Sequence, residues 1–420
     1  MGRSARDNRP HLKPVEKIQL SGENMTLRLI AAAAFLLLGA GLLAYAFTRL
    51  LTPESGWQAI EASASKEADC SGQFVFLYEL GAAGGSVSAE SRAVTQLYSD
   101  ACRRMFQVFH TLESFEGVTN LRDVNLHPNE MLTVDETLYR AFETVQRCGD
   151  RTVYLGPVYE RYDGLFHCTD DSQLVDYDPY LSEEVREEYE AAAAFANDPQ
   201  AIDLRLLGDD RVCLYVSEEY LTYAGQCEIE RYLDFGWMTN AFVIDYLAQV
   251  LTENGYTHGS ISSYDGFVRN LDDRELDYAV NLYDFADGGL YPAGVMSYRG
   301  PRSIVYLRDY PLNGEDGWRM YRLQTGEVRT GYLSSGDGRC KSAAHDLIAY
   351  SDTVGCAGIA LRLAPIYVAD TLDVTALEGL ADSGIQSVRI EDRVICGTDP
   401  GLTLTDLYEG EGARYTASLG

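Results

Sequence analysis

The chain has 420 residues, a formal net charge of −30 at pH 7 and 46% hydrophobic residues. This length and composition allow one large folded domain or two smaller ones. Because phosphate binding needs clustered Lys and Arg, the acidic balance argues against nucleic acid as a partner, and equally against a second, peripheral contact with anionic lipid.

An apolar segment near the N-terminus predicts a single membrane anchor. Residues 29–47 (LIAAAAFLLLGAGLLAYAF) carry no charge, and a helix of this length nearly crosses a hydrocarbon core about 30 Å thick. Basic residues before it predict that residues 1–28 are cytoplasmic, that residues 29–48 span the cell membrane once, and that the rest is extracytoplasmic. The alternative is a signal peptide cleaved after Ala44-Tyr45-Ala46, although the apolar run exceeds the usual length of about 7–15 residues.

Residues 49–69 then form a predicted linker, and residues 70–420 a predicted extracytoplasmic domain. All nine cysteines follow the anchor, without CxxC or Cys/His zinc spacing. Disulfides and buried free thiols both remain open from the sequence, and the odd count leaves at least one thiol free.

The domain interleaves strand-like and helical patterns. Asp135 and Glu136 mark the first turn of one predicted helix. In chain order, the predicted elements are a strand at 73–80, helices at 88–111, 133–148 and 183–195, a strand at 211–216, a helix at 240–253, and strands at 258–263, 278–283, 303–307 and 358–363. Because the order lacks strict strand–helix–strand alternation, we expect an α+β fold.

Common catalytic motifs are absent from the sequence. It contains no Walker loop, GxSxG, HExxH or dinucleotide GxGxxG, and its six histidines form no local metal pair. Short motifs alone therefore predict an anchored extracytoplasmic α+β domain and no particular chemistry.

Three segments resemble the FAD:protein FMN transferase family, also called ApbE. Residues 234–245 (DFGWMTNAFVID) resemble the family's DLGGIAKGYAVD and keep the first Asp, one Gly and the final Asp. Residues 260–269 (SISSYDGFVR) occupy the place of its GGN turn. Residues 369–377 (ADTLDVTAL) resemble ADALATAL.

Other segments follow the family's order. Residues 120–125 (NLRDVN) resemble the segment that ends in Asn after the first long helix. Residues 330–337 and 344–355 stand where the family has TSGdY and HHIxDPxTG. The resemblance covers residues 73–395 and rests on the order of the segments, since each motif alone is weak.

The resemblance implies an ApbE-like α+β domain that transfers FMN from FAD to a threonine of a flavinylation-acceptor protein, with Mg²⁺ as cofactor. Such phosphoryl-type transfer needs a hard cation on the pyrophosphate, held by oxygen ligands. The residues so assigned are Asp234, Gly236, Asn240, Asp265 and Gly266 for the flavin, Asp370, Asp373 and Thr375 for the metal, and His345 for catalysis. We further expect Asp234, Asp265 and Asp370 to approach one cleft.

Three departures from the family pattern predict weaker pyrophosphate binding, and weak or absent transfer. Asn240 replaces the Lys of the AKG turn, and Asp265 places a carboxylate in the GGN turn. Val374 offers no oxygen to a cation, although Asp373 and Thr375 are adjacent. The alternative function is a non-catalytic extracytoplasmic binding or structural module on the same fold.

Ordinary structural roles also fit several of these residues. Asp234 and Asp370 could cap turns or helices, and Gly236 and Gly266 suit tight turns in any fold. His345 equally suits a structural or surface position. The sequence leaves these roles and the flavin site as competing hypotheses.

Overall fold

The computed structural model describes residues 39, 53–63, 69–286, 288–312, 319–410 and 413–420, and Ser55–Gly420 form one compact unit. The predicted cytoplasmic segment and anchor lie outside the described residues, except Gly39. Within the described part of the chain, no helix is both long and apolar enough to cross a membrane.

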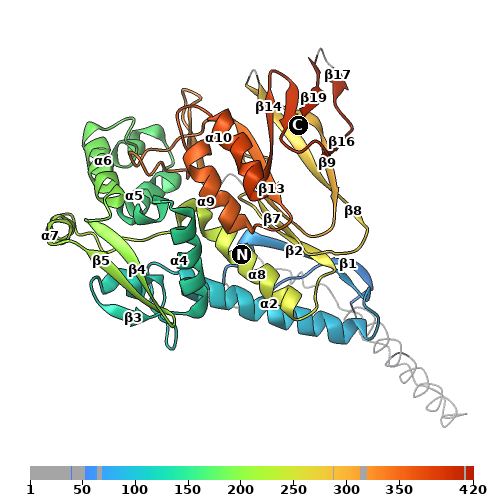
Figure 1. Ribbon diagram of the computed structural model, residues 1–420, viewed down its shortest axis with the longest axis horizontal. Helices are drawn as coiled ribbons and strands as arrows, with labels where there is room; N and C mark the ends of the chain where they lie inside the picture. The colour runs from blue at the N-terminus through green and yellow to red at the C-terminus, as the bar shows by residue number, and fades with distance from the viewer. Residues whose placement is uncertain (1–38, 40–52, 64–68, 287, 313–318, 411–412) are drawn as a thin grey trace, which may run out of the picture. The chain divides into compact units, whose positions relative to one another are not determined.

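A nine-stranded sheet forms the centre of this unit (Figure 1). Its strands pair antiparallel, except that β15 and β19 are parallel. The strands, in sheet order, are β1 (Gly56–Ala59), β2 (Phe74–Leu80), β6 (Gly259–Ser263), β7 (Phe267–Asn270), β10 (Arg302–Arg308), β13 (Asp346–Ser351), β14 (Gln386–Glu391), β15 (Val394–Gly397) and β19 (Thr416–Leu419).

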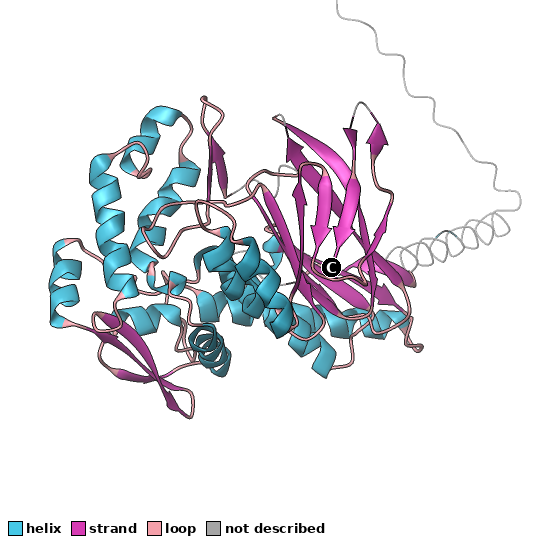
Figure 2. Cartoon of the chain, turned by 45° about the horizontal axis from the view of Figure 1, so that its top comes forward, coloured by secondary structure: helices cyan, strands magenta, loops and turns pink. Residues whose placement is uncertain are grey.

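Smaller sheets accompany the main one. Figure 2 shows the strands of the main sheet on the side of the C-terminus, and a small separate sheet among the helices on the other side. The smaller sheets are β8 (Asp277–Ala286) with β9 (Gly289–Arg299) and β16 (Thr403–Thr405), β3 (Met131–Thr133) with β5 (Arg211–Val216) and β4 (Ile202–Gly208), β11 (Met320–Arg322) with β12 (Val328–Thr330), and β17 (Glu409–Gly410) with β18 (Ala413–Arg414).

Helices α2, α8 and α9 pack against one another or against the main sheet. The α-helices are α2 (Val87–Phe109), α3 (Leu121–Leu126), α4 (Glu136–Cys148), α5 (Gly156–Tyr162), α6 (Glu183–Asn197), α7 (Glu218–Gln226), α8 (Thr239–Glu253), α9 (Cys356–Tyr367) and α10 (Val374–Gly379). The 3-10 helices are η1 (Ser71–Gln73), η2 (Thr152–Tyr154), η3 (Asp163–His167), η4 (Asp171–Asp176), η5 (Gly236–Met238) and η6 (Leu380–Ser383).

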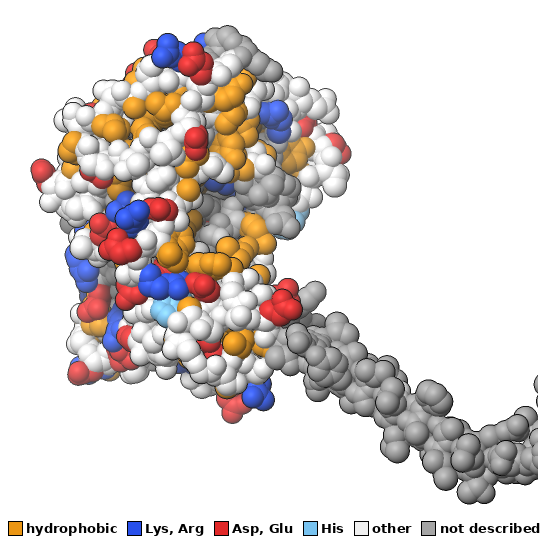
Figure 3. Space-filling view, turned by 90° about the vertical axis from the view of Figure 1, so that its right-hand side faces the viewer, with side chains coloured by type: hydrophobic (Ala, Val, Ile, Leu, Met, Phe, Trp, Pro, Cys, Tyr) orange, Lys and Arg blue, Asp and Glu red, His pale blue; other side chains and the backbone are white. Residues whose placement is uncertain are grey.

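The main sheet is buried on both faces by two hydrophobic cores. In β10, Val305 and Leu307 enter the large core with the helices, whereas Ile304 and Tyr306 enter a second core shared with β8 and β9. This alternation is the period-two pattern of a strand whose two faces are both covered. A space-filling view shows apolar side chains on the surface beside scattered charged ones (Figure 3), as is normal for a folded protein.

The predicted α+β class is confirmed, and one predicted strand is wrong. Residues 358–363 lie within helix α9. Every residue of α9 except Arg362 and Pro365 is buried, so the helix has almost no polar stripe to reveal its period. A short apolar run of this kind cannot be distinguished from a buried strand by periodicity.

Candidate functional site

Five parts of the chain form one small pocket, which we call the Asp265 pocket. They are η5, the β6–β7 turn, the end of β10, the start of β11, and the end of β12 with the two residues that follow it. The lining residues are Trp237, Asp265, Arg308, Arg319, Met320, Thr330, Gly331 and Tyr332. The cavity of about 30 Å³ admits roughly one or two water molecules.

Asn240 and Asp265 connect two of these segments. The Asn240 amide nitrogen donates a hydrogen bond of 2.9 Å to Asp265 Oδ2. The other carboxylate oxygen, Oδ1, is buried and has no hydrogen-bond partner among the described residues. Burial of the carboxylate raises the pKa of Asp265, and the nearby Arg319 charge opposes the rise. The pocket therefore contains an unused acceptor.

Gly236 and Gly266 are required by local geometry. Gly236 has φ +53°, and a Cβ there would lie 2.2 Å from the Tyr159 ring. Gly266 has φ +97°, and a Cβ there would lie 2.1 Å from the Tyr306 carbonyl oxygen. Positive φ and close backbone approach both favour glycine. These contacts support the turn role for both residues, and their part in flavin binding stays a prediction.

Asp234 organises the chain just before η5. Its Oδ1 accepts a 2.7 Å hydrogen bond from the Gly236 amide, and its Oδ2 lies 3.1 Å from an Arg231 guanidinium nitrogen. The residue is 9% exposed. Both carboxylate oxygens thus have local partners, which supports the turn role that the sequence left open.

Two arginines and two aromatic rings of the Asp265 pocket were missed by sequence reasoning. Arg319 donates a 3.0 Å hydrogen bond to the Gly236 carbonyl oxygen, and the Arg308 guanidinium lies 4.8 Å from the centre of the Tyr306 ring. The Trp237 and Tyr332 rings meet edge to face, with centroids 5.2 Å apart. The arginines follow no local motif, so only tertiary contact brings them to the pocket.

The predicted metal ligands have other partners. Asp370 Oδ2 lies 3.1 Å from Lys341 Nζ, and the Asp370 side chain is 82% exposed. Asp373 caps α10 by accepting a 2.9 Å hydrogen bond from the Ala376 amide, and Thr375 is exposed on that helix. Across the described ranges, no three His, Cys, Asp or Glu side chains are grouped to hold a metal ion. As arranged, these ligands do not fit Mg²⁺.

Asp265 and Asp370 line different pockets. The pocket of Asp370 also includes Leu333 and Lys341, and so adjoins Tyr332 of the Asp265 pocket along the chain. The structure thus brings Asn240 and Asp265 together, but it does not gather Asp234, Asp265 and Asp370 around one cavity.

His345 lies on the surface, with 58% of its side chain exposed. Its Nδ1 is 3.0 Å from Asp309 Oδ2, and this hydrogen bond raises the pKa of His345. The ring also meets Phe285, with centroids 5.2 Å apart. His345 does not line the Asp265 pocket, and its catalytic role stays a prediction.

No protein-family model matches the chain, and no curated protein matches it. Solved structures are similar in fold. The ApbE protein from Thermotoga maritima has a TM-score of 0.53 and 13% identity, covering 79% of this chain and 93% of that one. The flavin transferase ApbE from Vibrio cholerae has a TM-score of 0.53 and 13% identity, covering 84% and 97%. At this identity the likeness shows the fold, so the predicted ApbE-like fold is confirmed.

Proposed function

We propose that this chain is a membrane-anchored, extracytoplasmic flavin transferase of the ApbE type. It binds FAD at the Asp265 pocket and transfers FMN to a threonine of an acceptor protein. One observation carries the proposal: the segments around Asn240, Asp265 and Thr330, which resemble the family only by sequence order, meet at one pocket on an ApbE-like fold.

The arginines supply the charge that a pyrophosphate needs. Arg308 and Arg319 line the pocket together with the single carboxylate of Asp265. Guanidinium groups bind phosphate oxygens through paired hydrogen bonds, and they remain charged at any physiological pH. Arg308 and Arg319 therefore compensate for the neutral Asn240, where the family has a lysine.

The aromatic rings supply an apolar wall. Trp237 and Tyr332 meet at the pocket, and aromatic side chains offer large contact areas to a flat ring such as a flavin. Ligand sites for molecules of drug size measure about 300–1,000 Å³. The Asp265 pocket, at about 30 Å³, is much smaller, so FAD binding requires side chains that line it to move.

A divalent cation bound at the pyrophosphate would stabilise the charge that develops during transfer. Asp370, Asp373 and Thr375 do not form a cation site in the present arrangement, because the two carboxylates already serve Lys341 and the α10 cap. No step of transfer is therefore assigned to them.

The second candidate function is a flavin-binding module without transferase activity. The Lys341–Asp370 ion pair favours it, because a lysine occupies the carboxylate that the family resemblance assigns to the metal. Both candidates share FAD binding at the Asp265 pocket and differ only in transfer.

The test uses the full-length protein in detergent, with FAD, Mg²⁺ and an acceptor domain that contains a flavinylation threonine. Binding is followed by flavin fluorescence, and transfer by the mass added to the acceptor. We expect Arg319→Ala to weaken FAD binding about tenfold or more, and Arg103→Ala, on the exposed side of α2, to leave it unchanged.

The outcomes separate the two candidates. Labelling of the acceptor that disappears in Asp370→Ala establishes the transferase and its metal ligand. FAD binding without labelling establishes the binding module. Absence of FAD binding, or binding that Arg308→Ala and Arg319→Ala both leave intact, refutes the assignment of flavin to this pocket.

A further inference from the structure

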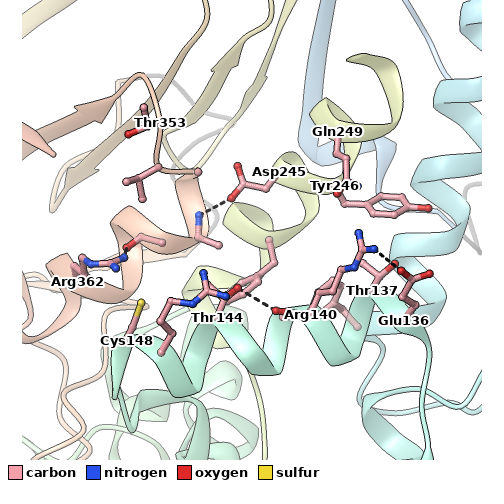
Figure 4. A pocket seen from close by; sticks show the side chains of 18 residues that line it. Glu136, Thr137, Arg140, Thr144, Cys148, Asp245, Tyr246, Gln249, Thr353 and Arg362 are labelled. Atoms are coloured by element: carbon pink, nitrogen blue, oxygen red, sulfur yellow. Dashed lines mark hydrogen bonds and ion pairs between the residues drawn. The ribbon is translucent and has the colours of Figure 1, made fainter. Parts of the chain in front are cut away.

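A second and larger cleft lies between helices α4, α8 and α9, and we call it the α4–α9 cleft (Figure 4). Its volume is about 400 Å³, and none of its lining residues also lines the Asp265 pocket. The flavin proposal therefore leaves this cleft without a function.

Three arginines line the α4–α9 cleft. Arg140 and Arg147 are seven residues apart on α4, so two helical turns place them on the same face. Arg362 comes from α9. Burial raises the pKa of the Cys148 thiol, the charges of Arg362 and Arg147 oppose this rise, and the charge of Asp150 adds a smaller effect in the other direction. Arg362 and Cys148 lie at the same end of the cleft (Figure 4), and Arg147 precedes Cys148 in α4.

The acidic residues of the cleft are already engaged. Glu136 forms an ion pair with Arg140, one turn along α4. Asp245 accepts hydrogen bonds of 2.9 Å from the amides of both Cys356 and Ala357, at the start of α9. It also pairs with Arg269 at 3.2 Å. Neither carboxylate is left to neutralise the other guanidinium groups.

Neither Arg147 nor Arg362 has a carboxylate partner among the residues that the structure describes. Arg147 has no ion pair among the described residues, and Arg362 donates a 2.8 Å hydrogen bond to the Gly358 carbonyl oxygen of its own helix. The chain carries 64 acidic and 34 basic residues, so two guanidinium groups without an ion-pair partner among the described residues make this cleft differ from the acidic chain as a whole. Such a pair favours an anionic ligand.

The cleft also has apolar walls. Phe109, Phe242, Tyr246 and Val354 line it, together with the polar side chains of Thr137 and Thr353. A volume of this size accommodates a small molecule rather than a lone ion. The ligand should therefore combine an anionic group with a ring or other apolar body.

We propose that the α4–α9 cleft binds a phosphate monoester with a ring-bearing body, which is the chemistry of a mononucleotide. The phosphate lies between Arg147 and Arg362, since two planar guanidinium forks match the oxygens of a dianion. The ring packs against Phe242 and Tyr246. This site goes beyond the proposed flavin function and does not depend on it.

Calorimetric titration of the full-length protein with AMP tests the proposal, with adenosine as the uncharged probe. We expect AMP to bind in a saturable manner, more weakly as the salt concentration rises, and adenosine to bind at least tenfold more weakly. Arg147→Ala and Arg362→Ala should each weaken AMP binding about tenfold or more. Arg103→Ala, which removes an exposed arginine elsewhere, should not change it.

Variants of the two pockets identify where AMP binds. The proposal holds if AMP binding responds to Arg147→Ala and Arg362→Ala but not to Arg308→Ala. It is overturned if AMP does not bind, if the Arg147 and Arg362 variants bind it like the parent protein, or if Arg308→Ala alone abolishes binding. Melting temperatures of all variants exclude misfolding as the cause, and the retained charge of Arg147→Lys should recover part of the affinity.

Discussion

Replacing Asp346 by asparagine should stabilise the protein at neutral and alkaline pH. Asp346 is 8% exposed, and its Oδ2 accepts a 3.1 Å hydrogen bond from the Tyr310 hydroxyl. Burial raises the pKa of Asp346 to about 7, and the charges of Asp284 and Asp309 add to this while His345 opposes it. The ordinary value for an aspartate is about 3.9.

The direction of the pH dependence follows from whether the folded or the unfolded protein holds the proton of Asp346. Between about pH 4 and pH 7 the folded protein retains a proton on Asp346 that the unfolded chain has released. The unfolding free energy therefore falls as pH rises through this window, and it levels off above the folded pKa. A difference of about three pKa units corresponds to about 4 kcal/mol in total. Asparagine does not titrate, so Asp346→Asn should not lose this unfolding free energy as the pH rises.

Denaturant unfolding of the parent protein and Asp346→Asn at pH 5 and pH 8 measures the effect. The variant should gain about 2–3 kcal/mol over the parent protein between these two pH values. Groups that do not interact with Asp346 titrate alike in both proteins and cancel in the difference, whereas His345, whose pKa the Asp346 charge raises, contributes to it. Asp382→Asn on the surface should remain within about 0.5 kcal/mol of the parent protein at both pH values. Equal pH slopes for the parent protein and Asp346→Asn would refute the reasoning.

Four further predictions concern stability and topology. Gly266→Ala should lower the unfolding free energy by about 3 kcal/mol or more, because φ is positive there and the new Cβ would clash with the backbone. Gly225→Ala, at an open position in a helix, should be neutral or stabilising, and thermal melting compares the two variants. Asp245→Ala removes two hydrogen bonds at the start of α9 and should cost about 1–3 kcal/mol, measured by denaturant unfolding. Asp370→Ala should change the melting temperature by less than about 1 °C, because its ion pair is exposed. Protease added to intact protoplasts should cleave the chain beyond Ser55, and full protection would contradict the predicted topology.

Local patterns were sufficient for most of the fold. The helix predicted at 133–148 is α4, and Asp135, expected in its first turn, caps it by accepting a hydrogen bond from the Thr137 amide. The strand predicted at 303–307 lies within β10. Helix α9 was mistaken for a strand because almost all of it is buried, and burial on every side removes the contrast on which periodicity depends.

The site could be predicted only in part. The resemblance assigned Asn240 and Asp265 to the same flavin site, and the structure joins them by a hydrogen bond, whereas Asp265 and Asp370, which were expected to share one cleft, line different pockets. Arg308 and Arg319 could not be found in the same way, because they reach the pocket from β10 and from the start of β11 without a shared motif.

The charge of the Asp265 pocket decides how the departures from the family pattern should be weighed. Sequence alone predicted a pocket more negative than the family's, from Asp265 and the missing lysine at Asn240. Among the described lining residues, the structure adds the two positive charges of Arg308 and Arg319 to the one carboxylate of Asp265, and burial raises the pKa of that carboxylate. Pyrophosphate binding therefore need not suffer from these two changes. The cation ligands are a separate matter, because Lys341 pairs with Asp370 whatever the charge of the Asp265 pocket. FAD affinity and FMN transfer consequently test different parts of the molecule: Arg308→Ala and Arg319→Ala should act on FAD affinity, whereas Asp370→Ala tests transfer alone.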